Sequence, residues 1–134
     1  MIGIVVISHG NFADELITAV NFVLAGKPAI KMIGMNLNRE VDFDAFKKDI
    51  KRTIKKVDKG DGVLLVTDMF GGTPSNISLT FLEENKVEVI SGVNLPMLIK
   101  LATLPENTTL SESVKIAEKA GRDNIIVASN LIKK

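Results

Sequence analysis

The chain has 134 residues, of which 46% are apolar and 25% are charged, so it is long enough for one globular domain over residues 1–134 and too apolar to be disordered. Its formal net charge of +1 gives no electrostatic reason to expect nucleic acid as a partner, and the absence of cysteine excludes disulfides, thiolate chemistry and cysteine metal sites. No apolar run approaches the ~20 residues that cross a bilayer, and residues 1–7 lack the charged region and cleavage site of a signal peptide, so we expect a cytoplasmic protein.

The first half of the chain alternates apolar, β-branched runs with segments whose apolar residues recur at helical spacing. The predicted elements are a strand over residues 2–7, a helix over 12–24 that stops at Gly26 and Pro28, a strand over 29–35 and a helix over 42–57. The last of these helices has one apolar and one lysine-rich face. We interpret the lysine-rich face as solvated surface rather than as a docking patch.

The same alternation continues through the second half of the chain. The predicted elements are strands over residues 63–67, 87–90 and 124–129, and helices over 77–83, 97–104 and from the capping pair Thr109 and Glu112 to Ala120, with Gly121 as a stop. Strands alternating with helices are typical of the α/β class, in a doubly wound, mostly parallel sheet with helices on both faces. In such sheets ligands bind beyond the carboxyl ends of the strands.

The stretch T-D-M-F-G-G-T-P-S-N, residues 67–76, connects a buried strand to a helix. Gly71 and Gly72 permit a sharp turn, Thr73 is a good N-cap, and Pro74 suits the first helical position. Such a turn directs several backbone N–H groups and the positive end of a helix toward one point, which would suit a phosphoryl group. An ordinary strand-to-helix connection with a cap explains the same residues, and this stretch alone leaves both interpretations open.

Two predicted strand ends carry residues suited to phosphoryl transfer. His9, the only histidine, follows the first strand, and Asp68 follows the third. If these strands are neighbours, the aspartate can bond one ring nitrogen and leave the other free as a nucleophile. The glycine turn would then stabilise the arriving phosphoryl group. Each residue taken singly has a simpler structural explanation, but together they favour a phosphohistidine site.

Three motifs in this order resemble the IIA component of the mannose-family sugar phosphotransferase system, and the resemblance spans essentially the whole chain. The motifs are V-V-I-S-H-G at residues 5–10, T-D-M-F-G-G-T-P-S-N at 67–76 and S-G-V-N-L-P-M-L at 91–98. The second and third motifs together are highly specific. The resemblance implies that His9 is the phosphorylated histidine, that Asp68 orients it by bonding Nδ1, and that Gly71, Gly72 and Thr73 form the phosphate-binding turn.

The resemblance also implies partners and an assembly. HPr would be the phosphoryl donor and a IIB component the acceptor, with membrane IIC and IID subunits reached indirectly, and no cofactor or metal is needed. We expect a separate IIB protein, because this chain ends at Lys134. The family implies the strand order 2-1-3-4 and a homodimer in which residues 124–129 cross to the partner's sheet. Candidate docking residues are Met69, Phe70, Pro74, Asn94 and Pro96.

Two other functions fit parts of the sequence. In a receiver-like domain Asp68 itself would be phosphorylated, but the first strand does not end in an acid pair able to hold Mg²⁺, and Ser129 stands where the last strand would carry a lysine. A nucleotide- or flavin-binding module could use a glycine turn at the same edge. However, the G-x-G-x-x-G spacing typical of dinucleotide sites is absent.

Overall fold

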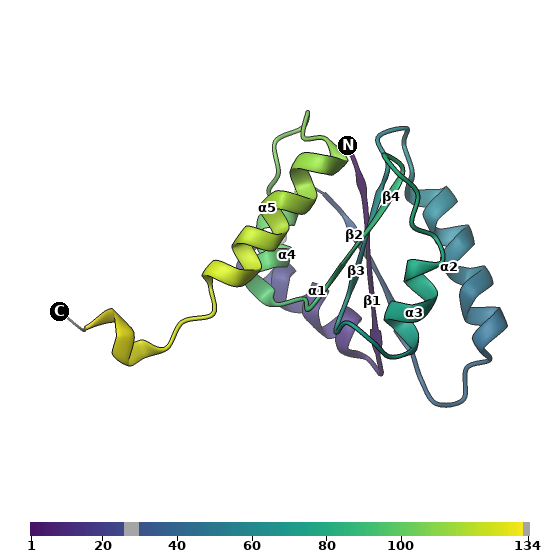
Figure 1. Ribbon diagram of the computed structural model, residues 1–134, viewed down its shortest axis with the longest axis horizontal. Coiled ribbons are helices and arrows are strands. Elements are labelled where there is room, and N and C mark those ends of the chain that lie inside the picture. The colour runs from purple at the N-terminus through teal and green to yellow at the C-terminus, as the bar shows by residue number, and fades with distance from the viewer. Residues whose placement is uncertain (26–29, 133–134) are drawn as a thin grey trace.

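A computed structural model describes residues 1–25 and 30–132, and the helix stop predicted at Gly26 and Pro28 lies outside the described residues. The strands are β1 (Gly3–His9), β2 (Met32–Leu37), β3 (Val63–Thr67) and β4 (Val87–Ser91). The helices are α1 (Phe12–Val23), α2 (Phe43–Val57), α3 (Thr73–Leu79), α4 (Leu95–Ala102) and α5 (Leu110–Asp123), followed by a short 3₁₀ turn, η1 (Ala128–Leu131). Figure 1 shows their arrangement.

The strands form one sheet in the order β2-β1-β3-β4, and every neighbouring pair is parallel. This confirms the doubly wound α/β fold and the strand order that the resemblance implied. In the register between β1 and β3, Ile7 lies opposite Thr67. The two chains therefore leave the sheet side by side, which brings His9 and Asp68 to the same edge.

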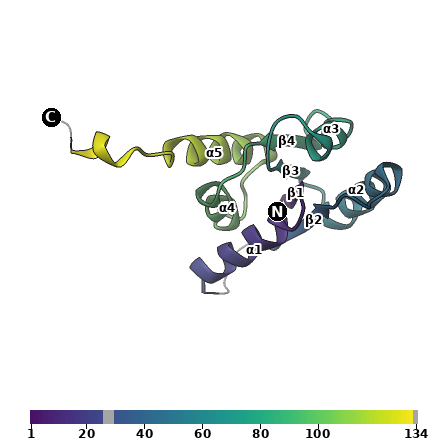
Figure 2. The same cartoon turned by 90° about the horizontal axis from the view of Figure 1, so that it is seen from below.

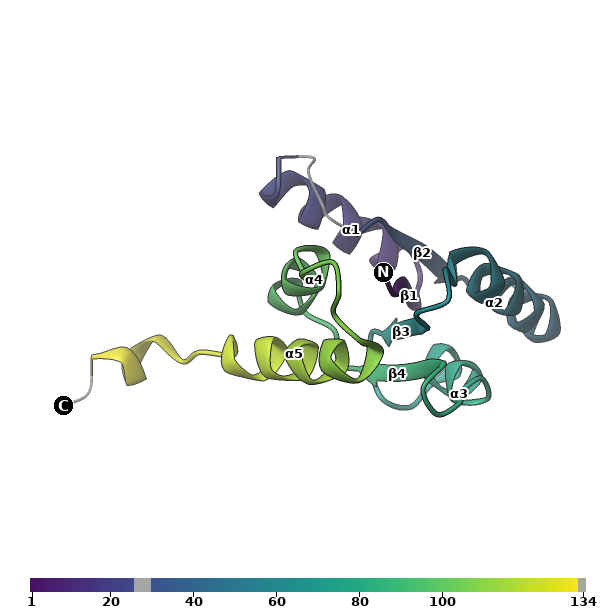
Figure 3. The same cartoon turned by 90° about the horizontal axis from the view of Figure 1, so that it is seen from above.

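The sheet is the middle of three layers, as seen along its edge in Figures 2 and 3. Alternate residues of β1 and β3 face opposite sides: Ile4 and Leu64 belong to the core under α1, α4 and α5, whereas Val5 and Leu65 belong to the core under α2 and α3. Because both faces of these central strands are buried, an unbroken apolar sequence is needed there, and this is the pattern that predicted them.

The helix after the glycine turn differs from its prediction at both ends. Gly72, with φ 83° and ψ 170°, is the N-cap residue, so Thr73 is the first helical residue and not the cap. The helix ends at Leu79 instead of continuing to residue 83. After Leu79 the backbone tightens, because the N–H groups of Thr80, Phe81 and Leu82 each donate to the carbonyl three residues back instead of four.

The predicted stop at Gly121 is also wrong, since α5 continues to Asp123. Gly121 is buried where α5 packs on α4, and a Cβ there would lie 2.9 Å from Met97 Cε. This glycine therefore permits close packing of two helices rather than ending one of them. At the other end of α5 the prediction is confirmed, because the Thr109 side chain accepts a hydrogen bond from the Glu112 N–H.

Residues 124–129 do not form the predicted strand. In the described part of the chain they leave the end of α5 and extend away from the body of the molecule, with η1 at their distal end (Figure 1). Their side chains are exposed, including those of Ile125, Ile126 and Val127. A strand requires a neighbour for its backbone hydrogen bonds, and the described residues of a single chain place no strand beside this segment.

Candidate functional site

His9 and Asp68 meet at the carboxyl edge of the sheet. His9 Nδ1 lies 2.8 Å from Asp68 Oδ2, and the backbone N–H of His9 donates to the same oxygen at 3.0 Å. The second carboxylate oxygen, Oδ1, accepts from the Met69 N–H at 3.1 Å. The Asp68 side chain is 12% exposed and the His9 ring 48% exposed. An anchored carboxylate therefore holds an imidazole that solvent or a partner can reach.

This contact selects one tautomer of the His9 ring. A carboxylate only accepts hydrogen bonds, so Nδ1 must carry the proton that it shares with Asp68. In the neutral ring the lone pair then lies on Nε2. The arrangement can present a nucleophilic nitrogen whose orientation is fixed by a group on a neighbouring strand.

The glycine turn lies against the free side of the His9 ring. Gly71 and Gly72 have φ values of 90° and 83°, a region of backbone conformation that favours glycine. A Cβ at Gly72 would lie 3.1 Å from His9 Cε1 and 3.2 Å from Nε2. The absence of a side chain at this position therefore leaves the space in front of Nε2 open.

The start of α3 offers hydrogen-bond donors in the same place. The Gly71 N–H donates to Ser75 Oγ at 3.2 Å, which fixes the turn. Within residues 1–25 and 30–132, no protein group accepts from the N–H of Gly72 or Thr73. The first N–H groups of a helix have no intrahelical acceptor, so these two are available to an anion that approaches Nε2.

Ser8 belongs to the site although sequence reasoning gave it no role. Its side chain is fully buried, and its Oγ accepts from the Ala13 N–H at 2.6 Å and lies 3.2 Å from the His9 carbonyl oxygen. Asn11, the N-cap residue of α1, makes no side-chain capping bond, so Ser8 satisfies a donor of the first turn instead. Ser8 therefore restrains the backbone that carries the His9 side chain.

The candidate docking residues fall into two groups. Met69 and Phe70 are 51% and 77% exposed and border the glycine turn. Pro74 is buried in the first turn of α3, and Pro96 is half-buried in the first turn of α4. The Asn94 side chain caps α4 by accepting from the Met97 N–H, and it donates to the Gly121 carbonyl. Only the first two residues offer a large apolar surface next to His9.

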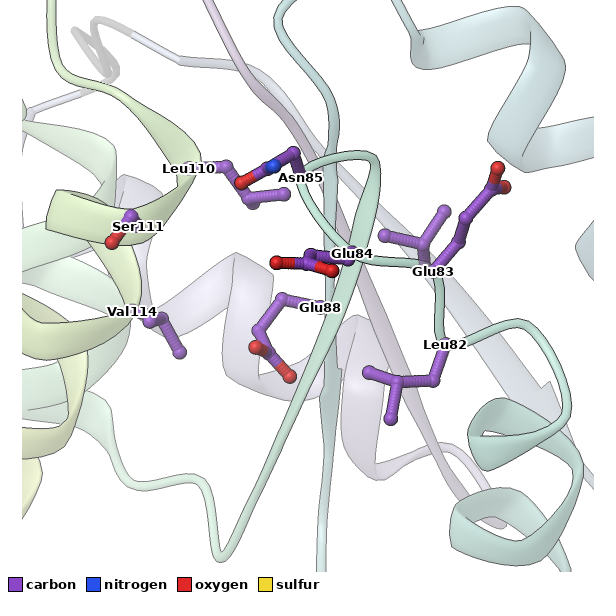
Figure 4. Close-up of a pocket in the computed structure, with 9 residues that line it drawn as sticks. Leu82, Glu83, Glu84, Asn85, Glu88, Leu110, Ser111 and Val114 are labelled. Atoms are coloured by element: carbon purple, nitrogen blue, oxygen red, sulfur yellow. The ribbon is translucent and has the colours of Figure 1, made fainter.

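The outer edge of β4 carries two hollows. One of about 400 Å³ runs beside the strand and is lined by residues that include Phe70, Val89 and Ser91. The other, of about 350 Å³, lies at the amino end of β4, far along the sheet from His9. Figure 4 shows Glu84 and Glu88 in this second hollow. Its lining residues include carboxylates but no histidine.

The described residues contain neither a metal-binding cluster nor a membrane-spanning helix. Residues 1–25 and 30–132 contain no group of three or more histidine, aspartate or glutamate side chains placed to hold a metal ion. In the same part of the chain, no helix is both long enough and apolar enough to span a bilayer.

The chain is similar over most of its length to several known proteins. A family model described as "PTS system fructose IIA component" matches residues 3–118. The fructose-specific EIIA component of Bacillus subtilis (strain 168) is 23% identical over 135 residues, covering 100% of this chain and 91% of that protein. The mannose-specific EIIAB component of Escherichia coli (strain K12) is 29% identical over 128 residues, covering 92% of this chain but only 38% of that longer protein.

Solved structures show the same fold. The phosphotransferase system component EIIA from Streptococcus agalactiae superposes with a TM-score of 0.82 at 26% identity, covering 97% of this chain and 99% of that one. The mannose/sorbose-specific IIA subunit from Enterococcus faecalis superposes with a TM-score of 0.81 at 20% identity, covering 94% and 93%.

Proposed function

Because this chain belongs to the mannose-type family of sugar phosphotransferase system IIA components, we propose that it is a phosphocarrier whose reactive atom is His9 Nε2. It would accept a phosphoryl group from phospho-HPr and pass it to a IIB component. The observation that carries this proposal is the 2.8 Å contact of Nδ1 with Asp68, which leaves Nε2 free in front of the glycine turn.

The transfer needs little covalent chemistry from the protein. The Nε2 lone pair forms the new bond to phosphorus while the bond from phosphorus to the donor's ring nitrogen breaks and its electron pair returns to the donor. The His9 ring then becomes positive, and Asp68 stabilises that charge through Nδ1–H. The N–H groups of Gly72 and Thr73 would stabilise the phosphoryl oxygens. Reversal of these steps delivers the group to IIB.

Partner proteins would approach over the exposed apolar pair Met69 and Phe70, which border the turn. Exposed apolar and aromatic side chains next to a reactive atom are the kind of surface on which partners form contacts. We place the protein in the cytoplasm, where IIB would carry the phosphoryl group on to sugar entering through the membrane subunits IIC and IID. The relatives of this chain are named for fructose, mannose and sorbose systems.

A homodimer is part of the same proposal. The outer edge of β4 has no strand beside it in the described residues, and the hollow along it is partly apolar. Residues 124–129 carry exposed apolar side chains and pair with no strand among residues 1–25 and 30–132. If residues 124–129 of one copy lay along β4 of another, the backbone N–H and C=O groups of both segments would find partners. The apolar surfaces of both segments would also be covered.

The direct test is transfer of a phosphoryl group. The protein is mixed with phosphoenolpyruvate, enzyme I and HPr, and its intact mass is followed beside that of His9→Ala. Gain of one phosphoryl unit by the natural chain alone is expected. If neither protein gains mass with competent partners, the proposal is wrong. If both gain mass, another residue is the acceptor, and Asp68 is the first to examine.

A further inference from the structure

Two hydroxyl side chains meet where β3 and β4 end. Thr67 and Ser91 lie opposite each other in the register, and Thr67 Oγ1 is 2.6 Å from Ser91 Oγ. Thr67 Oγ1 is also 3.2 Å from the Met69 carbonyl oxygen. Thr67 is fully buried in a strand whose other residues are all apolar. A valine would fill the same volume, so packing alone does not account for the hydroxyl.

The two contacts of Thr67 determine how the protons are shared. A hydroxyl has a single proton, so Thr67 can serve both contacts only if it donates to the Met69 carbonyl and accepts from Ser91. The Thr67 carbonyl in turn accepts from the N–H groups of Gly92 and Val93 at 3.1 and 3.2 Å. The end of β3 is therefore bonded to the end of β4 in two ways. The Thr67 side chain bonds Ser91, and the Thr67 backbone carbonyl bonds the two residues that follow β4.

The hydroxyls of Thr67 and Ser91 are linked by hydrogen bonds to the backbone next to Asp68. The Met69 N–H donates to Asp68 Oδ1, and the Met69 carbonyl accepts from Thr67. The backbone N–H and the backbone carbonyl of Met69 are thus both held, in the two peptide units on either side of its Cα, although the Met69 side chain is 51% exposed. These two bonds restrain the first part of the turn, at Met69, and the bond from the Gly71 N–H to Ser75 Oγ restrains its second part.

We propose that Thr67 and Ser91 are positioning residues for phosphoryl transfer. They hold the turn so that Asp68 faces His9 Nδ1 while Gly72 faces Nε2. The inference rests on the proposed function, because it assigns the pair a role in that reaction. Neither hydroxyl forms a hydrogen bond with the His9 ring, so both would act through the backbone of the turn.

The test uses Thr67→Val, which keeps the volume and removes the hydroxyl, and Thr67→Ser, which keeps the hydroxyl. Ser91→Ala removes the second member of the pair. Thr53→Val is the matched control, because its hydroxyl bonds the Asp49 carbonyl within α2, away from the site. Two properties are measured for each protein: the single-turnover rate of transfer from phospho-HPr, and the ¹⁵N shifts of the His9 ring nitrogens.

We expect Thr67→Val to slow transfer about tenfold, the size of effect that the loss of one buried hydrogen bond allows, while the final extent of phosphorylation is unchanged. Thr67→Ser and Thr53→Val should transfer at close to the natural rate. Ser91→Ala should be slower, and the double variant Thr67→Val/Ser91→Ala no slower than Thr67→Val alone, because the two hydroxyls act in series. The ring nitrogens should show Nδ1 protonated in the natural chain and a mixture of tautomers in Thr67→Val.

Several results would overturn the inference: a natural rate and ring spectrum in Thr67→Val, failure of Thr67→Ser to restore the rate, or additive losses in the double variant. If the natural chain accepts no phosphoryl group at all, the proposed function fails. The ring spectra still decide whether Thr67 and Ser91 position the His9–Asp68 pair, so the two failures are distinguishable.

Discussion

Asp68 restrains His9 at two points with one oxygen. Oδ2 accepts from both the ring and the backbone N–H of His9, so the carboxylate fixes the main chain from which the imidazole projects as well as the imidazole itself. Oδ1 is held by Met69, which prevents the carboxylate from rotating. A residue with three such bonds and 12% exposure serves orientation better than nucleophilic attack.

Replacement of Asp68 by asparagine should leave the fold intact and slow phosphoryl transfer by orders of magnitude. An amide group can present its NH₂ toward Nδ1, which would favour the wrong tautomer, and such a change costs about 10⁴ in rate in a serine protease triad. The measurement is the single-turnover rate of transfer from phospho-HPr. The control is Asp44→Asn, at an exposed position of α2. Transfer at the natural rate in Asp68→Asn would remove Asp68 from the mechanism.

Gly71 and Gly72 offer a matched pair for testing the open space in front of Nε2. Alanine at either position must adopt a positive φ, but a Cβ at Gly71 meets nothing within 4 Å, whereas one at Gly72 lies 3.2 Å from Nε2. We expect both variants to lose stability through backbone strain, of order 1–3 kcal/mol, and only Gly72→Ala to lose transfer far beyond that of Gly71→Ala. Chemical denaturation and transfer rates measure the two effects, and equal rates in the two variants would contradict the assignment.

The sequence predicted that His9 and Asp68 meet at one edge of the sheet, but it did not predict the residues that hold them there. His9 and Asp68 could be found because each follows an apolar strand, and parallel strands end at one edge. Ser8, Thr67 and Ser91 carry no such signal, since a buried hydroxyl is recognised only by the acceptor that it meets. That acceptor depends on strand register and turn geometry, which local patterns do not specify.

At the scale of elements, sequence spacing identified the side-chain cap of one helix and missed that of another. The helix predicted over residues 97–104 is α4 at Leu95–Ala102, because Asn94 was not recognised as its cap. Thr109 caps α5 through a local contact three residues away, which sequence spacing reveals. Gly121 has the appearance of a stop, yet it serves a tertiary contact with Met97 on α4. A glycine that permits close helix packing cannot be distinguished by local sequence from one that ends a helix.

Asn94 tests whether the α4–α5 junction is structural or a docking surface. Its carbonyl oxygen caps α4 and its amide donates to Gly121, so Asn94→Ala should lower the free energy of unfolding by about 1–2 kcal/mol. Asn94→Asp keeps the cap but loses the donor, and should fall between Asn94→Ala and the natural chain in chemical denaturation. Unchanged stability in Asn94→Ala, together with weaker binding of HPr or IIB, would instead indicate a docking role.

At the scale of the whole molecule, the pattern of alternating strands and helices predicted the four-stranded sheet correctly, whereas the last predicted strand, expected to cross to a partner's sheet, is not formed within the described single chain. Residues 124–129 have the apolar composition of a strand, but the described chain provides no edge beside them. An apolar, β-branched composition indicates that a segment can form a strand, but it does not indicate which strand will lie beside it. On the outer edge of β4 only Val87 is paired, through a bridge to Glu83 in the described residues, and the rest of that edge and the exposed tail would both be satisfied by a second copy.

Removal of residues 125–134 should convert a dimer into a folded monomer. The deletion keeps Asn124, whose amide donates to the Ala120 carbonyl at the end of α5, and it removes none of the buried apolar residues that form the two cores. Sedimentation at several concentrations measures the change in mass, and circular dichroism checks that the fold remains. Phe22→Asp, which alters an equally exposed apolar side chain on α1, should stay dimeric. If the truncated chain keeps the mass of the natural one, the tail does not hold two copies together.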